Sequence, residues 1–383
     1  MEYIRRILDD ELSTMLSVLP AIALEGAKGV GKTATALQRA QTVFSLEDED
    51  TSQIIAANPQ LLTRGEGTVF IDEWQVVPSV WNVVRREVDS GAVPGRFLLA
   101  GSASPRPEAR IHSGAGRIVR LPMRPLSLPE RGLVSPTVSL RELLAGGLSD
   151  SGGETDMDAG DYAEEILRSG FPGIRAALPE ARSHLLGSYV DRIVDHDVDL
   201  LGVRGRRSRS VREWLAAYGA ATGTTASYSS ILRAATPSQD DKPSKPTAMV
   251  YRDLLQRLWI LDPIPPWSPT LGHLDRLALS PKHHLVDPAL AALLVGATSA
   301  SLIRGKGPDT VKQDGTFLGA LFESLAVQTV RVLAQACGGV VLHFRMRGGD
   351  HEVDLIVQRP DLKVLVSRVR NSRQNSTPYG PPR

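Results

Sequence analysis

Along the first third of the chain, segments in which hydrophobic residues recur at helical spacing alternate with short, continuously apolar segments. From Ile4 to Leu16 the apolar residues recur at helical spacing with acidic residues between them, which predicts an amphipathic helix. Beyond it, short apolar runs typical of buried strands alternate with longer segments that have the helical period. The predicted strands are 21–25, 43–46, 68–72 and 97–100, and the predicted helices are 32–42, 51–63 and 79–90. Strands that alternate with helices indicate a parallel sheet covered on both faces, so we expect an α/β domain over residues 1–130.

The pattern changes after this domain. Residues 131–160 are rich in Gly, Ser, Asp and Thr and predict a linker. Residues 161–265 are mainly helical in period, and three predicted helices follow one another in the order of a winged helix-turn-helix. Residues 266–370 contain a long amphipathic helix followed by strand-like runs, which predicts a small α/β domain. The polar end, 371–383, has no periodicity and predicts a disordered tail.

Composition and charge narrow the class of protein. The chain has 383 residues and a net charge of +1, so no overall field draws it to nucleic acid or to a membrane. Its one cysteine, Cys337, allows neither an internal disulfide nor a thiolate metal cluster. The N-terminus lacks the features of a signal peptide, and the apolar stretches fall short of the roughly 20 residues that a membrane span needs. We expect a cytoplasmic protein without a membrane segment.

One motif carries clear chemistry. The eight residues Gly26, Ala27, Lys28, Gly29, Val30, Gly31, Lys32 and Thr33 match the P-loop pattern in full. Glycines permit the tight turn whose backbone N–H groups surround phosphates. Lys32 is expected to contact the β- and γ-phosphates, and the Thr33 hydroxyl to bind Mg²⁺. Because the loop follows a predicted strand and opens a predicted helix, the sequence predicts a nucleotide site.

Acidic residues at the end of the strand 68–72 would complete that site. Asp72 has the position of a Walker B acid that holds Mg²⁺, and Glu73 is placed to polarise the attacking water as a general base. Two acids that merely cap a strand are the alternative, and the P-loop upstream favours the functional interpretation.

Ser102 and Arg117 are further candidates with weaker support. Ser102 follows the strand 97–100 and could contact the γ-phosphate or the attacking water, although a turn serine explains it equally well. Arg117 could neutralise charge on the transferring phosphoryl group, in cis or from a neighbouring subunit of a homo-oligomer. A surface arginine is the alternative for Arg117.

Several sequence blocks resemble one family. Residues 3–131 resemble the AAA-like bacterial and archaeal ATPases that carry a C-terminal domain of unknown function, DUF4143. The blocks are 25–33, 44–48, 70–75, 97–102 and 116–127, and then 170–172, 189–198, 281–290, 318–327 and 352–354. The resemblance covers nearly the whole chain. It implies an AAA-like fold with ATP as the nucleotide, a winged-helix-like middle and a restriction-endonuclease-like end.

The nuclease-like fold that the resemblance implies has a specific set of metal-binding residues. In that fold a helix glutamate, an aspartate on one strand and a Glu-x-Lys on the next strand bind Mg²⁺ and activate water. Glu323 and Asp354 match the first two elements, but residues 364–370 contain no Glu-x-Lys. We therefore predict that the chain is not a competent nuclease, and our hypothesis is a truncated or frameshifted C-terminus.

Residues 204–258 could contact a partner. Arginines cluster between residues 204 and 212, which suits phosphates, and the third predicted helix carries Tyr251, Arg252 and Arg257 as a recognition helix would. A protein-interaction module with a solvated charged face explains the same pattern equally well. The sequence therefore predicts a Mg²⁺-dependent ATPase that acts on DNA or on a protein partner. The alternative is a binding switch controlled by nucleotide state, with little turnover.

Overall fold

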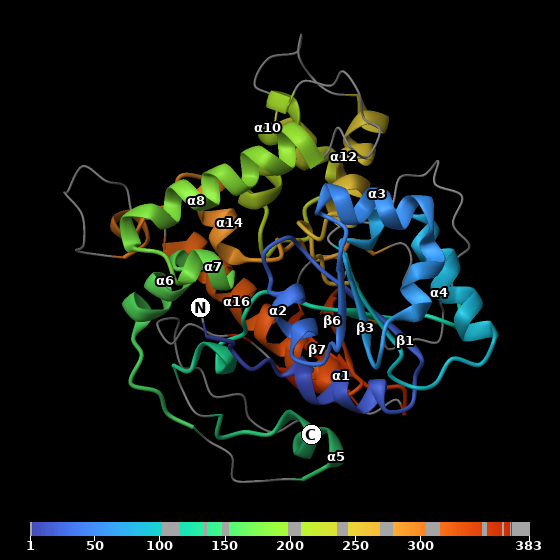
Figure 1. Cartoon of the computed structure of the whole chain (residues 1–383). Helices are drawn as coiled ribbons and strands as arrows, with labels where there is room; N and C mark the ends of the chain where they lie inside the picture. Colours follow the sequence, from blue (N-terminus) through green and yellow to red (C-terminus); the bar gives the residue numbers. More distant parts are fainter. Residues whose placement is uncertain are drawn as a thin grey trace.

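A parallel sheet forms the N-terminal domain. The computed structural model describes residues 2–101, 115–133, 136–147, 153–197, 208–235, 244–268, 279–303, 315–346, 351–361, 364–367 and 369. The five strands have the order β2-β3-β4-β1-β5, and all their pairings are parallel (Figure 1). They are β1 (Ala21–Glu25), β2 (Thr42–Ser45), β3 (Val69–Asp72), β4 (Phe97–Gly101) and β5 (Val119–Pro122). The sequence predicted the first four of these strands, and β5 was missed.

Helices cover both faces of this sheet. They are α1 (Leu8–Leu16), α2 (Lys32–Leu37), α3 (Glu49–Ala57) and α4 (Ser79–Asp89), with short 3-10 turns at Pro59–Arg64, Trp74–Val76 and Pro129–Arg131. The helix predicted over 32–42 ends early, at Leu37, and the one predicted over 51–63 ends at Ala57 and continues as a 3-10 turn. The Asp48 side chain caps α3 by accepting from the Thr51 N–H, so the start of that helix is fixed by sequence.

Alternate residues of the strands enter two separate apolar clusters. Ala23 and Ile71 face a cluster that includes Trp74 and Trp81, whose rings lie 4.5 Å apart. Ile22 and Phe70 face the other way, into a cluster that continues without a break through α1 and α2 into the helices of the C-terminal half. The parallel sheet and the helical region therefore share one hydrophobic core.

The helical region follows residue 153. Its helices are α6 (Ala159–Leu167), α7 (Pro172–Arg175), α8 (Pro179–Arg192) with a π-turn at Ile193–Asp197, α10 (Ser208–Ala220), α11 (Tyr228–Ala234), α12 (Lys245–Arg257), α14 (Pro288–Leu294) and α15 (Ser299–Leu302). Helices α10, α11 and α12 contact one another, as the three predicted helices should. After α12, isolated antiparallel bridges join Leu261 to Leu285 and Ile264 to Lys282.

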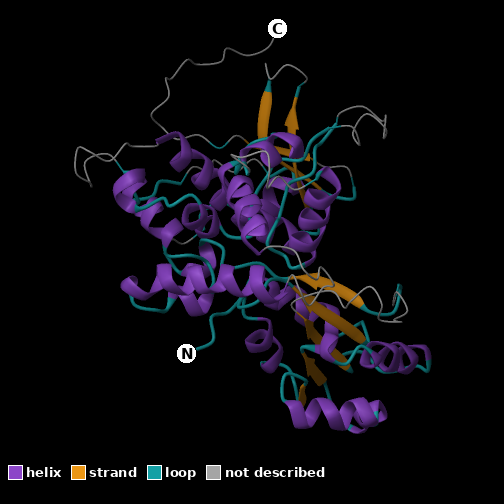
Figure 2. Cartoon of the chain, turned by 90° about the horizontal axis from the view of Figure 1, so that it is seen from above, coloured by secondary structure: helices purple, strands orange, loops and turns teal. Residues whose placement is uncertain are grey.

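The C-terminal end is a long helix and a small antiparallel sheet. They are α16 (Gly315–Ala336) and the strands β6 (Val340–Arg345), β7 (Glu352–Gln358) and β8 (Val364–Ser367), paired in that order. Figure 2 shows this sheet well apart from the larger one, with helices between them. The stretch predicted as a linker carries a helix, α5 (Leu140–Ala145), whose Leu144 is buried in the cluster under the small sheet. The predicted tail, 371–383, lies outside the described residues.

Helix α16 is apolar enough to deserve comparison with a membrane span. Within the described part of the chain it alone meets the length and composition of a spanning helix, contrary to the expectation that every apolar stretch falls short. A core helix of a globular protein meets the same test. Here Arg331 forms an ion pair with Asp262 at 2.9 Å, and Glu323 forms one with Lys282 at 2.7 Å. Both charged side chains of α16 thus have partners inside the protein, as a core helix requires.

A buried lysine joins α16 to the small sheet. The Lys282 ammonium lies 2.7 Å from Glu323, 2.8 Å from Glu352 and 3.1 Å from Asp354, and Lys282 is 1% exposed. Burial raises the pKa of Glu323 to about 7; Lys282 opposes this rise, and the charges of Asp354 and Glu352 add to it. The three carboxylates raise the pKa of Lys282 well above its ordinary value. The ammonium therefore stays charged at neutral pH and holds the carboxylates together.

The raised pKa of Glu323 makes a prediction about stability. Because the folded pKa of about 7 exceeds the ordinary 4.5, this carboxyl contributes stability that is fully present below about pH 4.5 and is lost as pH rises through 7. The loss amounts to about 3 kcal/mol at most. Glutamine at position 323 cannot titrate. Urea unfolding at about pH 5 and about pH 7.5 should therefore show Glu323→Gln gaining stability relative to the wild type as pH rises.

Glu180→Gln is the matched control, since Glu180 is exposed on α8. It should keep the wild-type pH dependence. If the pH dependence of Glu323→Gln parallels that of the control, Glu323 does not titrate as described.

Candidate nucleotide site

The P-loop connects the carboxyl end of β1 to α2, and its glycines meet strict spatial demands. A Cβ on Gly26 would lie 2.2 Å from the carbonyl oxygen of Met123, which follows β5. Gly31 has a φ of 100° and Gly29 a φ of 77°, in the left-handed region that L side chains avoid. Successive backbone N–H groups in such a turn form a concavity suited to anions. The three glycines thus permit the tight turn that the P-loop motif predicts.

Lys32 lies across the inside of the loop. Its Nζ donates to the carbonyl oxygens of Gly26, at 2.8 Å, and of Ala27, at 2.9 Å. The side chain is buried, and this burial lowers the pKa of Lys32 to about 8 although Glu73 and Asp72 act in the opposite direction. The ammonium is therefore already positioned beside the amides, in a setting where an added anion would favour its charged form.

Thr33 and Asp72 come together from different elements. The Thr33 hydroxyl, in the first turn of α2, donates to Asp72 Oδ2 at 2.8 Å, and Asp72 ends β3. Burial raises the pKa of Asp72, and the hydrogen bond from Thr33 partly opposes that rise. A hydroxyl and a carboxylate oxygen are the hard ligands that Mg²⁺ prefers, so this donor pair fits the ion.

Glu73 sits in a strained turn that its neighbours hold. It has a φ of 49°, in the left-handed region, which costs an L-residue roughly 1–2 kcal/mol. Trp74 anchors the turn in the core, and the Gln75 side-chain amide donates a hydrogen bond to Glu73 Oε2. A Cβ on Gly101 would lie 2.6 Å from Gln75 Oε1 and 2.7 Å from Trp74 Nε1, so the end of β4 must be glycine. Strain of this kind persists where the surroundings determine the backbone, and it is concentrated at active sites.

Of the other two predicted residues, the structure describes only Arg117. Ser102 lies outside the described residues; β4, which ends at Gly101 just before it, lies between β1 and β3 in the sheet. Arg117 precedes Val119, which pairs with Ile22 near the amino end of β1, whereas the P-loop follows the carboxyl end. Its guanidinium pairs with Asp89 at the end of α4, at 2.8 Å. The structure therefore does not bring Arg117 to the phosphates of its own P-loop.

Sequence reasoning missed the residues that hold the outside of the loop. Arg6 donates to the Val30 carbonyl oxygen at 2.8 Å, and its guanidinium also contacts the Arg124 carbonyl at 2.6 Å and Glu130 at 3.0 Å. From the helical region, the Tyr189 hydroxyl donates to the Lys28 carbonyl oxygen at 3.2 Å. Both residues lie far from the motif along the chain. The one signal in the sequence was Arg6 itself, a basic residue among the polar positions at the start of the predicted amphipathic helix.

The structure changes the picture of the predicted partner surface. Tyr251 is 3% exposed and belongs to the core, so it cannot contact a nucleic-acid base. Arg209 pairs with Glu213 and Arg212 with Asp191, so acidic residues accompany the described part of the basic cluster. Arg252 stacks over the Tyr228 ring and pairs with Asp253. The remaining arginines, at 204, 206 and 207, lie outside the described residues.

The second site that the sequence considered is a charge cluster with a lysine at its centre. The structure brings Glu323 and Asp354 together, as the nuclease-like resemblance implied, and adds Glu352. The lysine among them is Lys282, which no Glu-x-Lys pattern on the last strand would have located. Within the described ranges no group of three or more His, Cys, Asp or Glu side chains is arranged to hold a metal ion.

Two family models match the chain in succession. Residues 19–131 match the AAA domain, and residues 159–301 match a domain of unknown function, DUF8612. The second match falls where the sequence resemblance implied DUF4143, so the comparison supports the AAA part of that resemblance and not its C-terminal part.

Two mycobacterial proteins and several solved structures are similar to the chain. The uncharacterized proteins Rv2008c of Mycobacterium tuberculosis and Mb2031c of Mycobacterium bovis are each 27% identical over 365 residues, which cover 92% of this chain and 71% of theirs. Among solved structures, the Walker-type ATPase paby2304 of Pyrococcus abyssi has 16% identity and a TM-score of 0.41, over 75% of this chain and 94% of that one. A RuvB mutant of Thermotoga maritima has 17% identity and a TM-score of 0.29, over 71% and 94%. Residues 19–131 therefore match the AAA domain and contain the complete P-loop motif, and residues 159–301 match a domain whose function is unknown.

Proposed function

We propose that the chain is a Mg²⁺-dependent ATPase that converts ATP and water to ADP and phosphate. The observation that carries the proposal is the meeting of Lys32, Thr33, Asp72 and Glu73 at one edge of the sheet. They come from the loop after β1, the start of α2 and the end of β3. A purely structural loop would not need a buried lysine beside two acids.

Each residue has a role that its position supports. The loop amides and Lys32 would bind the β- and γ-phosphates, and Thr33 and Asp72 would hold Mg²⁺. When bound, Mg²⁺ supplies charge neutralisation for the phosphate oxygens. The raised pKa of Asp72 reflects its burial, and a cation at this position would favour the charged carboxylate.

Glu73 is the general base in this proposal. Its carboxylate accepts a proton from water as the water oxygen bonds to the γ-phosphorus, and the bond from that phosphorus to the leaving ADP oxygen breaks. Gln75 donates to one carboxylate oxygen of Glu73 and so helps to hold the carboxylate in position. Arg117 could assist only from a second copy of the chain, because it lies at the opposite edge of the sheet from the loop of its own copy.

Lys32→Ala tests the binding part of the proposal. We expect nucleotide affinity to fall on the order of 100-fold or more, because each charge-assisted hydrogen bond to phosphate contributes about 1.5–3 kcal/mol. Titration with a fluorescent ATP analogue measures the change. Lys245→Ala, at an exposed position on α12, is the control and should bind as the wild type does. Equal affinity in Lys32→Ala would show that nucleotide does not bind at the P-loop.

Glu73→Gln tests the chemical part. We expect the variant to bind ATP within about twofold of the wild type and to turn it over about 100-fold more slowly, the size of a lost general base. Phosphate release under saturating ATP measures turnover. Glu66→Gln, exposed on the loop before β3, should leave both quantities unchanged. Unchanged turnover in Glu73→Gln would remove Glu73 from catalysis.

We further propose that DNA stimulates the ATPase. The alternative is a binding switch controlled by nucleotide state. A nucleotide-controlled switch would bind ATP tightly and hydrolyse it negligibly, whereas a DNA-coupled ATPase would be stimulated by double-stranded DNA. We expect stimulation that weakens steeply with salt, because the arginines between residues 204 and 212 would contact phosphates. Steady-state ATP turnover with and without DNA, at low and moderate salt, separates the two. Tight ATP binding with negligible turnover under every condition would favour the switch.

A further inference from the structure

The outward carbonyls of the P-loop are held by residues outside the motif. In a trans peptide the C=O of one residue and the N–H of the next point in opposite directions. A donor that fixes a carbonyl on the outside of the loop therefore aims the following N–H towards the inside. Arg6 does this at Val30, which aims the Gly31 amide, and Tyr189 does it at Lys28, which aims the Gly29 amide.

Tyr189 differs from Arg6 because it belongs to a different part of the chain. Arg6 lies within the N-terminal domain, whereas Tyr189 lies on α8, 161 positions after Lys28 and within the residues that match DUF8612. The helical region thus supplies one of the groups that shape the phosphate cradle.

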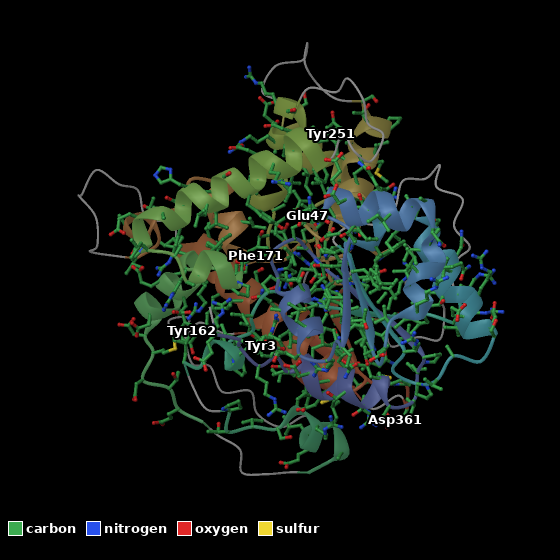
Figure 3. The ribbon with its side chains drawn as sticks, in the orientation of Figure 1. Tyr3, Glu47, Tyr162, Phe171, Tyr251 and Asp361 are labelled. Atoms are coloured by element: carbon green, nitrogen blue, oxygen red, sulfur yellow. The ribbon has the colours of Figure 1, made fainter. Side chains whose placement is uncertain are left out.

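The position of Tyr189 is fixed by a rigid neighbourhood. Its ring packs on the buried Phe171 ring at 5.0 Å. Figure 3 shows Phe171 between α7 and the N-terminal domain, and a Cβ on Gly29 would lie 3.8 Å from its ring. Phe171 is held in turn because the buried Asp287 accepts from the Ser169 hydroxyl at 3.0 Å and from the Gly170 N–H at 2.6 Å. The aromatic pair therefore rests on the Lys28–Gly29 turn from a fixed base.

We propose that Tyr189 is a positioning residue of the nucleotide site, which orients the Gly29 amide towards the phosphates and couples occupancy of the loop to helix α8. The proposal rests on the proposed function, since it concerns the same loop. Tyr189 contacts neither nucleotide nor water in this scheme and acts only through the peptide that it holds.

Coupling between loop and helix works in both directions. If the Tyr189 contact favours the conformation that binds phosphate, bound phosphate must favour the Tyr189 contact to the same extent. Nucleotide binding should then steady α8, which also carries Asp191, the partner of Arg212 on α10. The helical region would register nucleotide state through a single hydroxyl.

Tyr189→Phe removes that hydroxyl and keeps the ring that packs on Phe171. We expect ATP and ADP to bind about three- to tenfold more weakly, the effect of one neutral hydrogen bond, with turnover at saturating ATP unchanged. The measurement is titration of the full chain with a fluorescent ATP analogue and with ADP, together with phosphate release. Tyr162→Phe is the matched control, because Tyr162 packs on Phe322 at 5.0 Å and loses the same atom.

Hydrogen exchange of residues 179–192 gives a second readout that a merely structural role would not change. Saturating ADP should slow exchange there in the wild type and in Tyr162→Phe, and the effect should be lost in Tyr189→Phe. Equal melting temperatures for both variants would show that the fold is not at issue.

The outcomes separate this inference from the function on which it rests. Wild-type protein that binds no nucleotide overturns both. Wild-type protein that binds nucleotide, with Tyr189→Phe equal to it in affinity and in exchange of α8, overturns only the role of Tyr189. Weaker binding and lost protection in Tyr189→Phe alone support the inference.

Discussion

A phosphate cradle made of backbone amides cannot hold its own shape. Its N–H groups must converge on the anion, so its carbonyls need donors from elsewhere, since buried peptide oxygens without partners are costly. In this chain Lys32 serves the carbonyls of Gly26 and Ala27 from within the motif. Arg6 and Tyr189 serve Val30 and Lys28 from 24 and 161 positions away. The motif specifies which amides are available, and distant residues specify where they point.

That dependence agrees with the way the two halves are packed. One face of the parallel sheet continues into the core of the helical region, so the N-terminal domain would expose apolar surface if it were separated. A buried charge network reinforces the join. Arg124, just after β5, and Arg331 on α16 both pair with Asp262, and against the effect of burial they hold the pKa of Asp262 at about 2. Removing either half would leave a buried charge without its partner, which is costly.

The sequence predicted the local elements well and the distant contacts poorly, for physical reasons. Four strands, the P-loop and the two acids at the end of β3 follow from period and motif, which are properties of neighbouring residues. Strand β5 was missed because Val119–Pro122 is short, carries an arginine and ends in proline, so it lacks the apolar run of a central strand. Helix α2 ends early, and nothing in residues 32–42 marks the stop. The contacts of Arg6, Tyr189 and Asp287 depend on the folded chain and leave no periodic trace.

The cluster of Lys282 and its three carboxylate partners is a second example of a contact that the sequence pattern did not predict. The missing Glu-x-Lys shows only that the last strand supplies no lysine. A lysine from another segment of the chain can still reach the same position in the folded protein. Lys282, from a segment that pairs with Ile264, puts its ammonium within 3.1 Å of three carboxylates that belong to α16 and β7. An ammonium in that position supplies the cation that repelling carboxylates require, and its own pKa rises accordingly. These three ion pairs join the small sheet to the long helix. The P-loop is different in kind, because its lysine and amides face a place where a further anion would relieve the cost of burying them.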